Sequence, residues 1–163
     1  MEVRRINPDE CEQAGRVTRQ AYDEFVDPVD SDWGGYLDEI ENVAGRAGRV
    51  HVLVAIESGR VLGSASLETE EANLGDDPIE PGTANIRMLG VDPEARGRGA
   101  GRALLDACIS EARREGKRAV TLHTTDDMHA ALGLYASAGF VRDPARDWEV
   151  VENFTLTAYR LDL

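Results

Sequence analysis

The sequence predicts a mixed α/β fold in which antiparallel strands come first, a parallel pair of strands follows, and helices cover both faces of the sheet. Two apolar stretches in the first half flank a short glycine-containing turn, as in an antiparallel hairpin. The second half alternates strand, helix, strand and helix, the pattern of a crossover between parallel strands. A length of 163 residues suits one core, so we expect a single domain over residues 1–163.

The N-terminal quarter of the chain predicts one short strand and two helices. Residues 3–6 have the composition of a strand, and Asn7, followed by proline and two acids, marks the start of a helix that we extend to Phe25. The segment 27–35 is acidic and rich in turn residues, and a second helix is expected over 36–44. This region is therefore mainly helical.

Three strands are predicted in the middle of the chain. Residues 50–56 and 60–67 are rich in β-branched or small apolar side chains and flank the turn Glu57-Ser58-Gly59, so they form the expected hairpin. Residues 68–82 are acidic and contain two prolines, which predicts a long exposed loop. The apolar stretch 84–91 is the third strand.

The C-terminal part predicts two helices that alternate with strands. A helix follows a glycine-rich turn and ends at Gly116, a strand covers 119–124, and Asp126 or Asp127 caps the next helix. A further strand and loop come next, and residues 154–161 have the alternating pattern of a closing strand.

The charge and cysteine content of the chain limit its partners and its location. With 31 acidic and 18 basic residues, the formal net charge is −13, so we expect no nucleic acid or anionic membrane as a partner. The N-terminal residues lack the apolar run of a signal peptide, and no apolar stretch is long enough to span a bilayer. Cys11 and Cys108 have no metal-ligand spacing, and we expect both to be reduced and buried in a cytoplasmic protein.

The segment 86–102 carries the strongest functional signal. It runs from an apolar strand into a turn rich in glycine and arginine, and the turn opens a helix. Backbone N–H groups and a helix N-terminus then converge on one place, which suits a pyrophosphate. Arg96, Arg98 and Arg102 lie here with no carboxylate among them. The glycines would also fit a tight turn alone, but the arginines favour an anion site.

The spacing distinguishes this turn from two other phosphate-binding motifs. The Walker A motif requires Gly-Lys followed by Ser or Thr, which occurs nowhere in the chain. The dinucleotide motif G-x-G-x-x-G needs glycine where Arg102 stands, and residues 91–95 separate the strand from the glycines. The first motif is excluded and the second is disfavoured.

Two segments resemble the signatures of the GNAT superfamily of N-acetyltransferases. The pattern V-x-P-x-x-[QR]-x-x-G-x-[GA] is matched by Val91, Pro93, Arg96, Gly99 and Gly101, and A-x-x-L-Y-x-x-x-G-F is matched by residues 131–140. The resemblance is strong over 84–140. It implies a GNAT-like acyl-CoA N-acyltransferase fold in which the parallel pair of strands splays apart. It also implies acetyl-CoA or another acyl-CoA as co-substrate and an amine as acceptor.

The resemblance assigns the donor site to two stretches of backbone. The pantetheine arm enters the gap between the splayed strands and is bound near Leu89 and Val91. The pyrophosphate is cradled by the turn and the start of the helix, namely Arg96, Gly97, Arg98, Gly99, Ala100, Gly101 and Arg102. No metal is expected.

The resemblance also gives a catalytic role to Tyr135, which matches the superfamily tyrosine whose hydroxyl faces the CoA sulfur. A phenol with a pKa of about 10 stays protonated at pH 7 and can donate to the departing thiolate. The competing interpretation places Tyr135 in the core, because its helix also has apolar residues at Met128, Ala131 and Leu132.

Two positions depart from the superfamily pattern. Many relatives have glutamate where Asn85 stands, and asparagine cannot take a proton from the attacking amine, although it can orient a water. Glu68 and Glu70 are candidate replacements, but loop carboxylates are more commonly exposed. Met128 stands where relatives have an asparagine that contacts the CoA arm.

The sequence thus predicts transfer of an acetyl group from acetyl-CoA to an amine by direct attack in a ternary complex. Cys108 lies within a helix, which disfavours a covalent thiol intermediate. His123 and His129 are expected to have packing or surface roles. The alternative is a catalytically inactive acyl-CoA sensor or interaction module, which the residues at positions 85 and 128 leave open.

The acceptor stays open among a cationic small molecule, a peptide N-terminus and a protein lysine. The acidic segments 23–41 and 68–80 favour a cationic acceptor, and Trp33 and Tyr36 are candidates to line its pocket. Dimers are frequent in the superfamily, so a homodimer also stays open.

Overall fold

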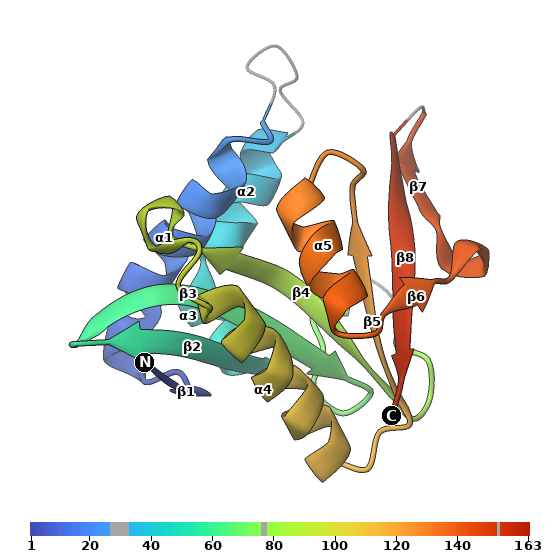
Figure 1. Cartoon of the computed structure of the whole chain (residues 1–163), viewed down its shortest axis with the longest axis horizontal. Helices are drawn as coiled ribbons and strands as arrows, with labels where there is room; N and C mark the ends of the chain where they lie inside the picture. The colour runs from blue at the N-terminus through green and yellow to red at the C-terminus, as the bar shows by residue number, and fades with distance from the viewer. Residues whose placement is uncertain (27–32, 76–77, 153) are drawn as a thin grey trace.

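The chain forms an eight-stranded mixed sheet with helices on both faces (Figure 1). The computed structural model describes residues 1–26, 33–75, 78–152 and 154–163. The strands are β1 (Glu2–Arg5), β2 (His51–Glu57), β3 (Arg60–Thr69), β4 (Thr83–Val91), β5 (Ala119–Thr124), β6 (Val141–Arg142), β7 (Trp148–Val151) and β8 (Phe154–Asp162). The helices are α1 (Cys11–Asp23), α2 (Trp33–Glu41), α3 (Val43–Ala47), α4 (Ala100–Arg114) and α5 (His129–Ser137), with short 3-10 turns η1 (Pro8–Glu10), η2 (Pro93–Ala95) and η3 (Pro144–Arg146).

The strand order confirms the predicted fold class. The strands follow the order β1-β2-β3-β4-β5-β8-β6, and β7 pairs with β8 outside this path. Neighbouring described strands are antiparallel except β4 and β5, which pair in parallel. The predicted hairpin is confirmed as well, since β2 and β3 are joined by Ser58 and Gly59. Both residues have positive φ, as a two-residue hairpin turn requires.

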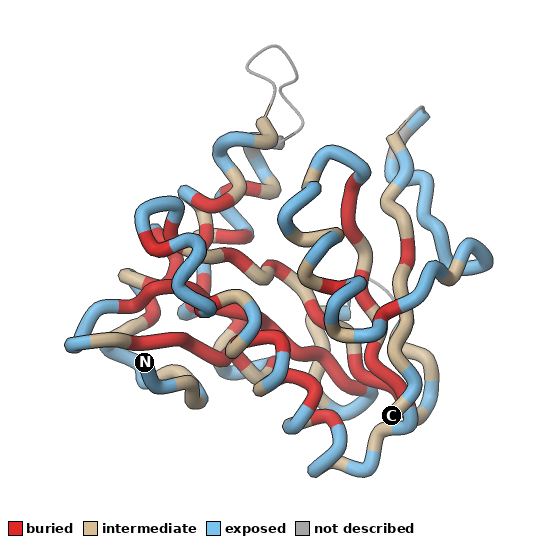
Figure 2. The backbone as a smooth tube through the Cα atoms, viewed as in Figure 1, coloured by how far each residue is buried: buried red, intermediate tan, exposed pale blue. Residues whose placement is uncertain are grey.

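Hydrophobic clusters on both faces of the sheet hold the layers together. On one face, Leu104 of α4 packs with Ile86 of β4 and Leu122 of β5. On the other face, Val43 of α3 packs with Val54 of β2. Figure 2 shows the central strands as mostly buried between these layers. No helix in the described ranges combines the length and the apolar character needed to cross a membrane.

The predicted helix over 36–44 is wrong in extent, because the chain forms α2 and α3 with a break at Asn42 between them. The Asn42 side-chain oxygen accepts a hydrogen bond from the backbone N–H of Gly45 at 3.0 Å. An asparagine in this position starts a new helix, so the apolar pattern that crosses it belongs to two helices. Residues 27–32 of the predicted acidic turn lie outside the described residues.

The predicted cap of α5 is also wrong. The helix begins at His129 with Met128 at its N-cap, and neither Asp126 nor Asp127 has that place. Asp127 instead accepts a hydrogen bond from the Thr125 hydroxyl. A short polar side chain that bonds a neighbour two residues away favours a turn before the helix, which delays the helix start.

The predicted loop over 68–82 begins later than expected. Strand β3 continues to Thr69, so Glu68 lies within the strand, directly opposite Asn85 of β4. The Glu68 side chain is 3% exposed, which contradicts the expectation of an exposed loop carboxylate. A buried carboxylate needs hydrogen-bond partners, and those of Glu68 belong to the site described below. Residues 76 and 77 lie outside the described residues.

The contact between α1 and α2 gives a test of the packing. A Cβ at Gly15 of α1 would lie 2.1 Å from the carbonyl oxygen of Glu41, so Gly15→Ala should lower the free energy of unfolding by about 1–3 kcal/mol. The matched control is Gly133→Ala in α5, where a Cβ meets nothing within 4 Å. This change should stabilise by up to about 1 kcal/mol through helix propensity. Urea unfolding measures both, and equal effects would contradict the packing described.

Candidate functional site

The site begins where β4 and β5 separate. Their last paired residues are Ile86 and Leu122, whereas β4 continues to Val91. Beyond Ile86, β4 is paired with β3 alone among the described strands. Figure 1 shows β4 and β5 diverging toward their C-terminal ends, as the resemblance implied. An unpaired strand edge leaves backbone N–H and C=O groups available to a ligand.

A bulge at Met88 accompanies the separation. The register between β3 and β4 shifts between Ser64 and Ser66. Met88 has a φ of +53°, in the left-handed region that side-chain-bearing residues rarely adopt. Its buried side chain packs with Leu37 and Ile40 of α2. This packing holds the strained backbone, and a bulge changes the direction of the backbone that follows it.

Leu89 and Val91, the two predicted pantetheine contacts, follow the bulge and are half-buried. The hydroxyl of Tyr22 in α1 donates a hydrogen bond to the carbonyl oxygen of Leu89 at 3.3 Å. The carbonyl oxygen of Leu89 therefore already accepts a hydrogen bond from the protein itself.

The glycine turn has the geometry of an anion cradle. Gly97 and Gly99 have φ of +75° and +85°, a conformation that disfavours any residue with a Cβ. Gly99 is the N-cap of α4, and no side chain of the described residues caps this end of the helix. The first N–H groups of a helix have no partner within it. At Gly101 a Cβ would make only ordinary contacts of 3.5 Å, so the conformational requirement for glycine lies at 97 and 99.

Each arginine of the turn has a carboxylate partner from elsewhere in the fold. Arg96 pairs with Glu24 at 2.5 Å, Arg98 pairs with Glu57, and Arg102 pairs with Asp106 at 2.9 Å. The local excess of positive charge that the sequence shows is therefore compensated in the folded chain. All three arginines remain about half exposed. Among the described residues, the backbone N–H groups at the start of α4 are thus the part of the cradle whose partial positive charge is not paired with a carboxylate.

Tyr135 lies in the core and borders the start of α4. It belongs to the core cluster between α4, α5 and the sheet, and its ring centre is 5.9 Å from that of Phe140. Burial, with a smaller contribution from Cys108, raises its pKa to about 12. Residues Leu134 and Ser137, on either side of it, face Gly101 and Arg102 of α4. The core position is confirmed, and the high pKa keeps the hydroxyl protonated.

The two cysteines are free and buried, as expected. Burial, followed by the negative charge of Glu111, raises the pKa of Cys108 to about 12. A thiol with this pKa has almost no thiolate at neutral pH. This agrees with the expectation that Cys108 forms no covalent intermediate.

A buried polar network joins β3, β4 and β5 on the face opposite α4. The side-chain amide of Asn85 donates to Glu68 at 3.1 Å, and its oxygen accepts from the Thr121 hydroxyl at 3.1 Å. Glu68 also accepts from the backbone N–H of Leu74 at 3.0 Å and lies 3.7 Å from Arg87. Many superfamily members have glutamate at the position of Asn85. In this chain a buried glutamate, Glu68, lies directly opposite that position on the neighbouring strand β3. Glu70 is exposed and accepts from a backbone N–H.

A cavity of about 220 Å³ opens beside this network. Because Asn85 and Thr121 alternate with core residues of β4 and β5, the cavity lies on the face of the sheet away from α4. His123 lines it and hydrogen-bonds the carbonyl of Arg146 at 2.8 Å, whereas His129 is exposed. The lining residues are Pro78, Ile79, Glu80, Thr83, Asn85, Thr121, His123, Arg146, Trp148, Ala158 and Tyr159.

Two arginines on this face were missed by sequence reasoning. Arg46 of α3 is 4% exposed, and its guanidinium donates to the Ser66 hydroxyl at 3.0 Å. Arg87 lies opposite Ser66 in the β3–β4 register and hydrogen-bonds Tyr36. No sequence pattern indicates a role for Arg46, since it stands in a glycine-rich helix end. Of the two aromatic residues expected at an acceptor pocket, Tyr36 is here, and the Trp33 side chain lies outside the described residues.

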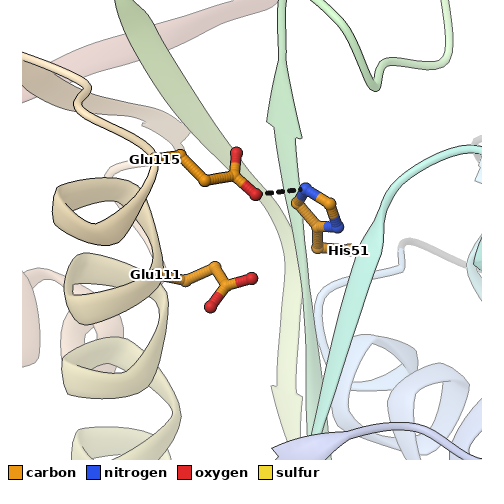
Figure 3. Close-up of side chains that lie close together, drawn as sticks. All are labelled: His51, Glu111 and Glu115. Carbon is orange, nitrogen blue, oxygen red and sulfur yellow. Dashed lines mark ion pairs between the residues drawn. The ribbon is translucent and has the colours of Figure 1, made fainter.

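A separate cluster lies between α4 and β2. Figure 3 shows His51, Glu111 and Glu115 facing one another, with His51 and Glu115 2.8 Å apart. Their potential ligand atoms lie within 4.8 Å of each other. Arg5 pairs with both glutamates, and Arg114 pairs with Glu111. These guanidinium groups neutralise the charges of the two carboxylates. The cluster therefore links β1 and β2 to α4 through ion pairs.

Comparisons with known proteins agree with this geometry. Residues 16–140 match the model of the acetyltransferase (GNAT) family. Mycothiol acetyltransferase from Geodermatophilus obscurus is 38% identical over 89 residues, which is 55% of this chain and only 28% of that protein. The chain therefore spans about a quarter of the length of this curated relative.

Solved structures match over nearly the whole chain. PaiA N-acetyltransferase from Thermoplasma acidophilum, in complex with coenzyme A, has a TM-score of 0.76 at 15% identity and covers 99% of this chain and 98% of its own. Ribosomal-protein-alanine N-acetyltransferase from Brucella melitensis has a TM-score of 0.71 at 22% identity over the full length of both chains. At these identities the likeness shows the fold. With a splayed parallel pair, a glycine cradle and a family match over most of its length, the chain belongs to the GNAT acetyltransferase family.

Proposed function

We propose that the protein transfers an acetyl group from acetyl-CoA to an amine by direct attack in a ternary complex. The observation that carries the proposal is the pair of left-handed glycines at the uncapped start of α4. They lie next to the end of β4, beyond its last pairing with β5. This is a backbone site for an anion beside a free strand edge, which suits an elongated phosphorylated donor.

The donor fits two parts of the chain. Backbone N–H groups of Ala100, Gly101 and Arg102, with the turn residues before them, receive the pyrophosphate at the positive end of the helix. The free edge of β4 at Leu89 and Val91 receives the amide-containing arm. Arg96, Arg98 and Arg102 are exposed enough to turn from their carboxylate partners toward phosphate oxygens.

The reaction forms one N–C bond and breaks one C–S bond. A neutral amine loses one proton as the amide forms, and the departing thiolate gains one. An amine that arrives as an ammonium ion loses one further proton to solvent before it attacks. Acetyl-CoA supplies the acetyl group as a thioester, which needs no further activation by a metal. The chain must therefore supply a proton donor near the sulfur and a route for the amine proton.

Tyr135 is the proposed proton donor. Its pKa of about 12 lies above that of a thiol, near 8.5, so transfer to the thiolate on its own is uphill at equilibrium. Its part is to donate a hydrogen bond to the sulfur as negative charge develops there, with the final proton supplied through solvent. The Tyr135 ring is held by the core cluster that also contains Phe140.

The amine proton leaves on the other face. Asn85 has no basic atom, and its amide is held by Glu68 and Thr121. We propose that Asn85 and Thr121 orient water in the adjacent cavity, and that Glu68 is the carboxylate to which this water passes the proton. Amines with a pKa near 10.4 require such a route at neutral pH, since about one molecule in a thousand is neutral.

The direct test is thiol release from acetyl-CoA with a panel of amines, with the product identified by mass. Tyr135→Phe should lower kcat about 100-fold with little change in the KM for acetyl-CoA. Gly133→Ala on the same helix, where an added Cβ meets nothing within 4 Å, is the control and should have little effect on kcat. Since the pKa of Tyr135 is about 12, loss of its proton should not limit kcat between pH 7 and 10. Binding of acetyl-CoA without turnover of any amine would favour the sensor.

A second test addresses the cradle. Gly99→Ala places a Cβ at a φ of +85°, which strains the cap of α4, and we expect at least tenfold weaker binding of acetyl-CoA by calorimetry. Gly116→Ala is the matched control, because Gly116 has a similar φ of +72° after the other end of α4. Both variants should lose about 1–2 kcal/mol of stability. If they bind acetyl-CoA equally, the cradle is elsewhere.

A further inference from the structure

Asp92 is a buried carboxylate at the point where β4 ends and the glycine turn begins. It is 4% exposed and follows Val91, the last residue of the strand. Its side chain accepts a hydrogen bond from the backbone N–H of Glu94 at 2.9 Å and pairs with Arg60. A buried charge needs partners of this kind. Asp92 is therefore held by two contacts, although the proposed reaction does not use it.

The backbone of Asp92 is fixed as well. Its N–H donates to the carbonyl oxygen of Leu62 in β3 at 2.8 Å, and its carbonyl oxygen accepts from the N–H of Ala95 at 2.8 Å. Asp92 is the N-cap of η2, and the proline that follows it has the φ with which a helical turn begins. Ala95, which ends η2, is buried in the core under α4. The chain therefore leaves β4 in a direction that Asp92 determines.

The hairpin of β2 and β3 contacts both ends of the segment that follows β4. Arg60, which starts β3, pairs with Asp92 and also with Glu94 at 3.2 Å. Glu57, which ends β2, pairs with Arg98, which stands between the two left-handed glycines. In the proposed complex Arg98 leaves Glu57 when it turns toward phosphate, whereas Arg60 can keep its contact with Asp92. The hairpin can therefore hold this segment while the donor is bound.

This segment sets the distance between the two halves of the proposed donor site. Residues 92–99 join the free edge of β4, proposed for the amide-containing arm, to the start of α4, proposed for the pyrophosphate. The arm and the pyrophosphate belong to one molecule, so both contacts form together only when the two stretches of backbone are correctly spaced. An error in the spacing of two linked contacts weakens binding of the whole ligand.

We propose that Asp92 is a positioning residue for the acyl-CoA donor. Together with Arg60, it holds residues 92–99 so that the edge of β4 and the start of α4 fit one donor molecule. The proposal rests on the proposed function, because it places acetyl-CoA in this site. In this role Asp92 acts through the backbone of Glu94 and the turn that follows, and the donor itself is bound by backbone further along. Loss of Asp92 should therefore raise the KM for acetyl-CoA more than it lowers kcat.

Calorimetry with acetyl-CoA tests the proposal. Asp92→Ala removes both side-chain contacts and should weaken binding by about tenfold or more. Asp92→Asn keeps an oxygen for the N–H of Glu94 but loses the charge that faces Arg60, so we expect about threefold weaker binding. Arg60→Met removes the same ion pair from the other side and should match Asp92→Asn. The double variant should bind no more weakly than either single variant, since both changes remove one interaction.

The matched control removes a comparable cap elsewhere in the chain. Asn42 at the start of α3 accepts a hydrogen bond from the backbone N–H of Gly45 at 3.0 Å, as Asp92 does from that of Glu94. Asn42→Ala should lower the unfolding midpoint and leave acetyl-CoA binding unchanged. With an amine that the protein acetylates, kcat of the Asp92 variants at saturating acetyl-CoA should stay within about twofold of the wild-type value.

The proposal is overturned if Asp92→Asn and Arg60→Met both bind acetyl-CoA as tightly as the wild-type protein. Arg60 is about half exposed, so Arg60→Met gives this answer even if Asp92→Ala does not fold. If Asn42→Ala weakens binding as much as Asp92→Ala, loss of stability explains the effect and the proposal also fails. A wild-type protein that binds no acetyl-CoA overturns the donor site itself, a result distinct from tight binding by wild type and variants alike.

Discussion

The separation of β4 from β5 is the constraint on which the site depends. The strands stop pairing after Ile86, and the bulge at Met88 turns the rest of β4 away. Helix α1 holds this segment from one face, since a Cβ at Gly90 would lie 3.1 Å from side-chain atoms of Thr18 and Ala21. Helix α4 packs on the other face. An opening in the middle of a sheet is stable here because both strands beside it still pack into the shared core under α4, and β4 also packs against α2 on the other face through Met88.

This opening is bordered by different functional groups on the two faces of the sheet. Alternate residues of β4 point to opposite sides, so Ile86 enters the core under α4 and α5, while Asn85 and Arg87 face the cavity side. The backbone cradle and Tyr135 belong to the first face. The polar network and the buried guanidinium groups belong to the second. In the proposed reaction, donor and acceptor therefore approach the same gap from opposite faces of the sheet.

The sequence predicts best those features that consecutive residues determine. The glycine turn, the helix after it and the position of Tyr135 depend on local conformation and on a motif, and the structure has these elements in the expected places. Glu68 could not be placed in this way, because its burial depends on how far β3 extends and on its register with Asn85. The compensation of Arg98 by Glu57, 41 residues away in the chain, likewise depends on tertiary structure.

The net charge is another property from which the sequence alone cannot predict the site. A formal charge of −13 sums over a surface where solvent and salt screen most groups beyond about 10 Å. Inside the opening, screening is weaker, and a few side chains determine which ligand is favoured. There the buried Glu68, which contacts Asn85 and Arg87, counts for more than many exposed carboxylates. The composition argued for a cationic acceptor, but a charge summed over the whole surface does not determine which ligand the opening binds.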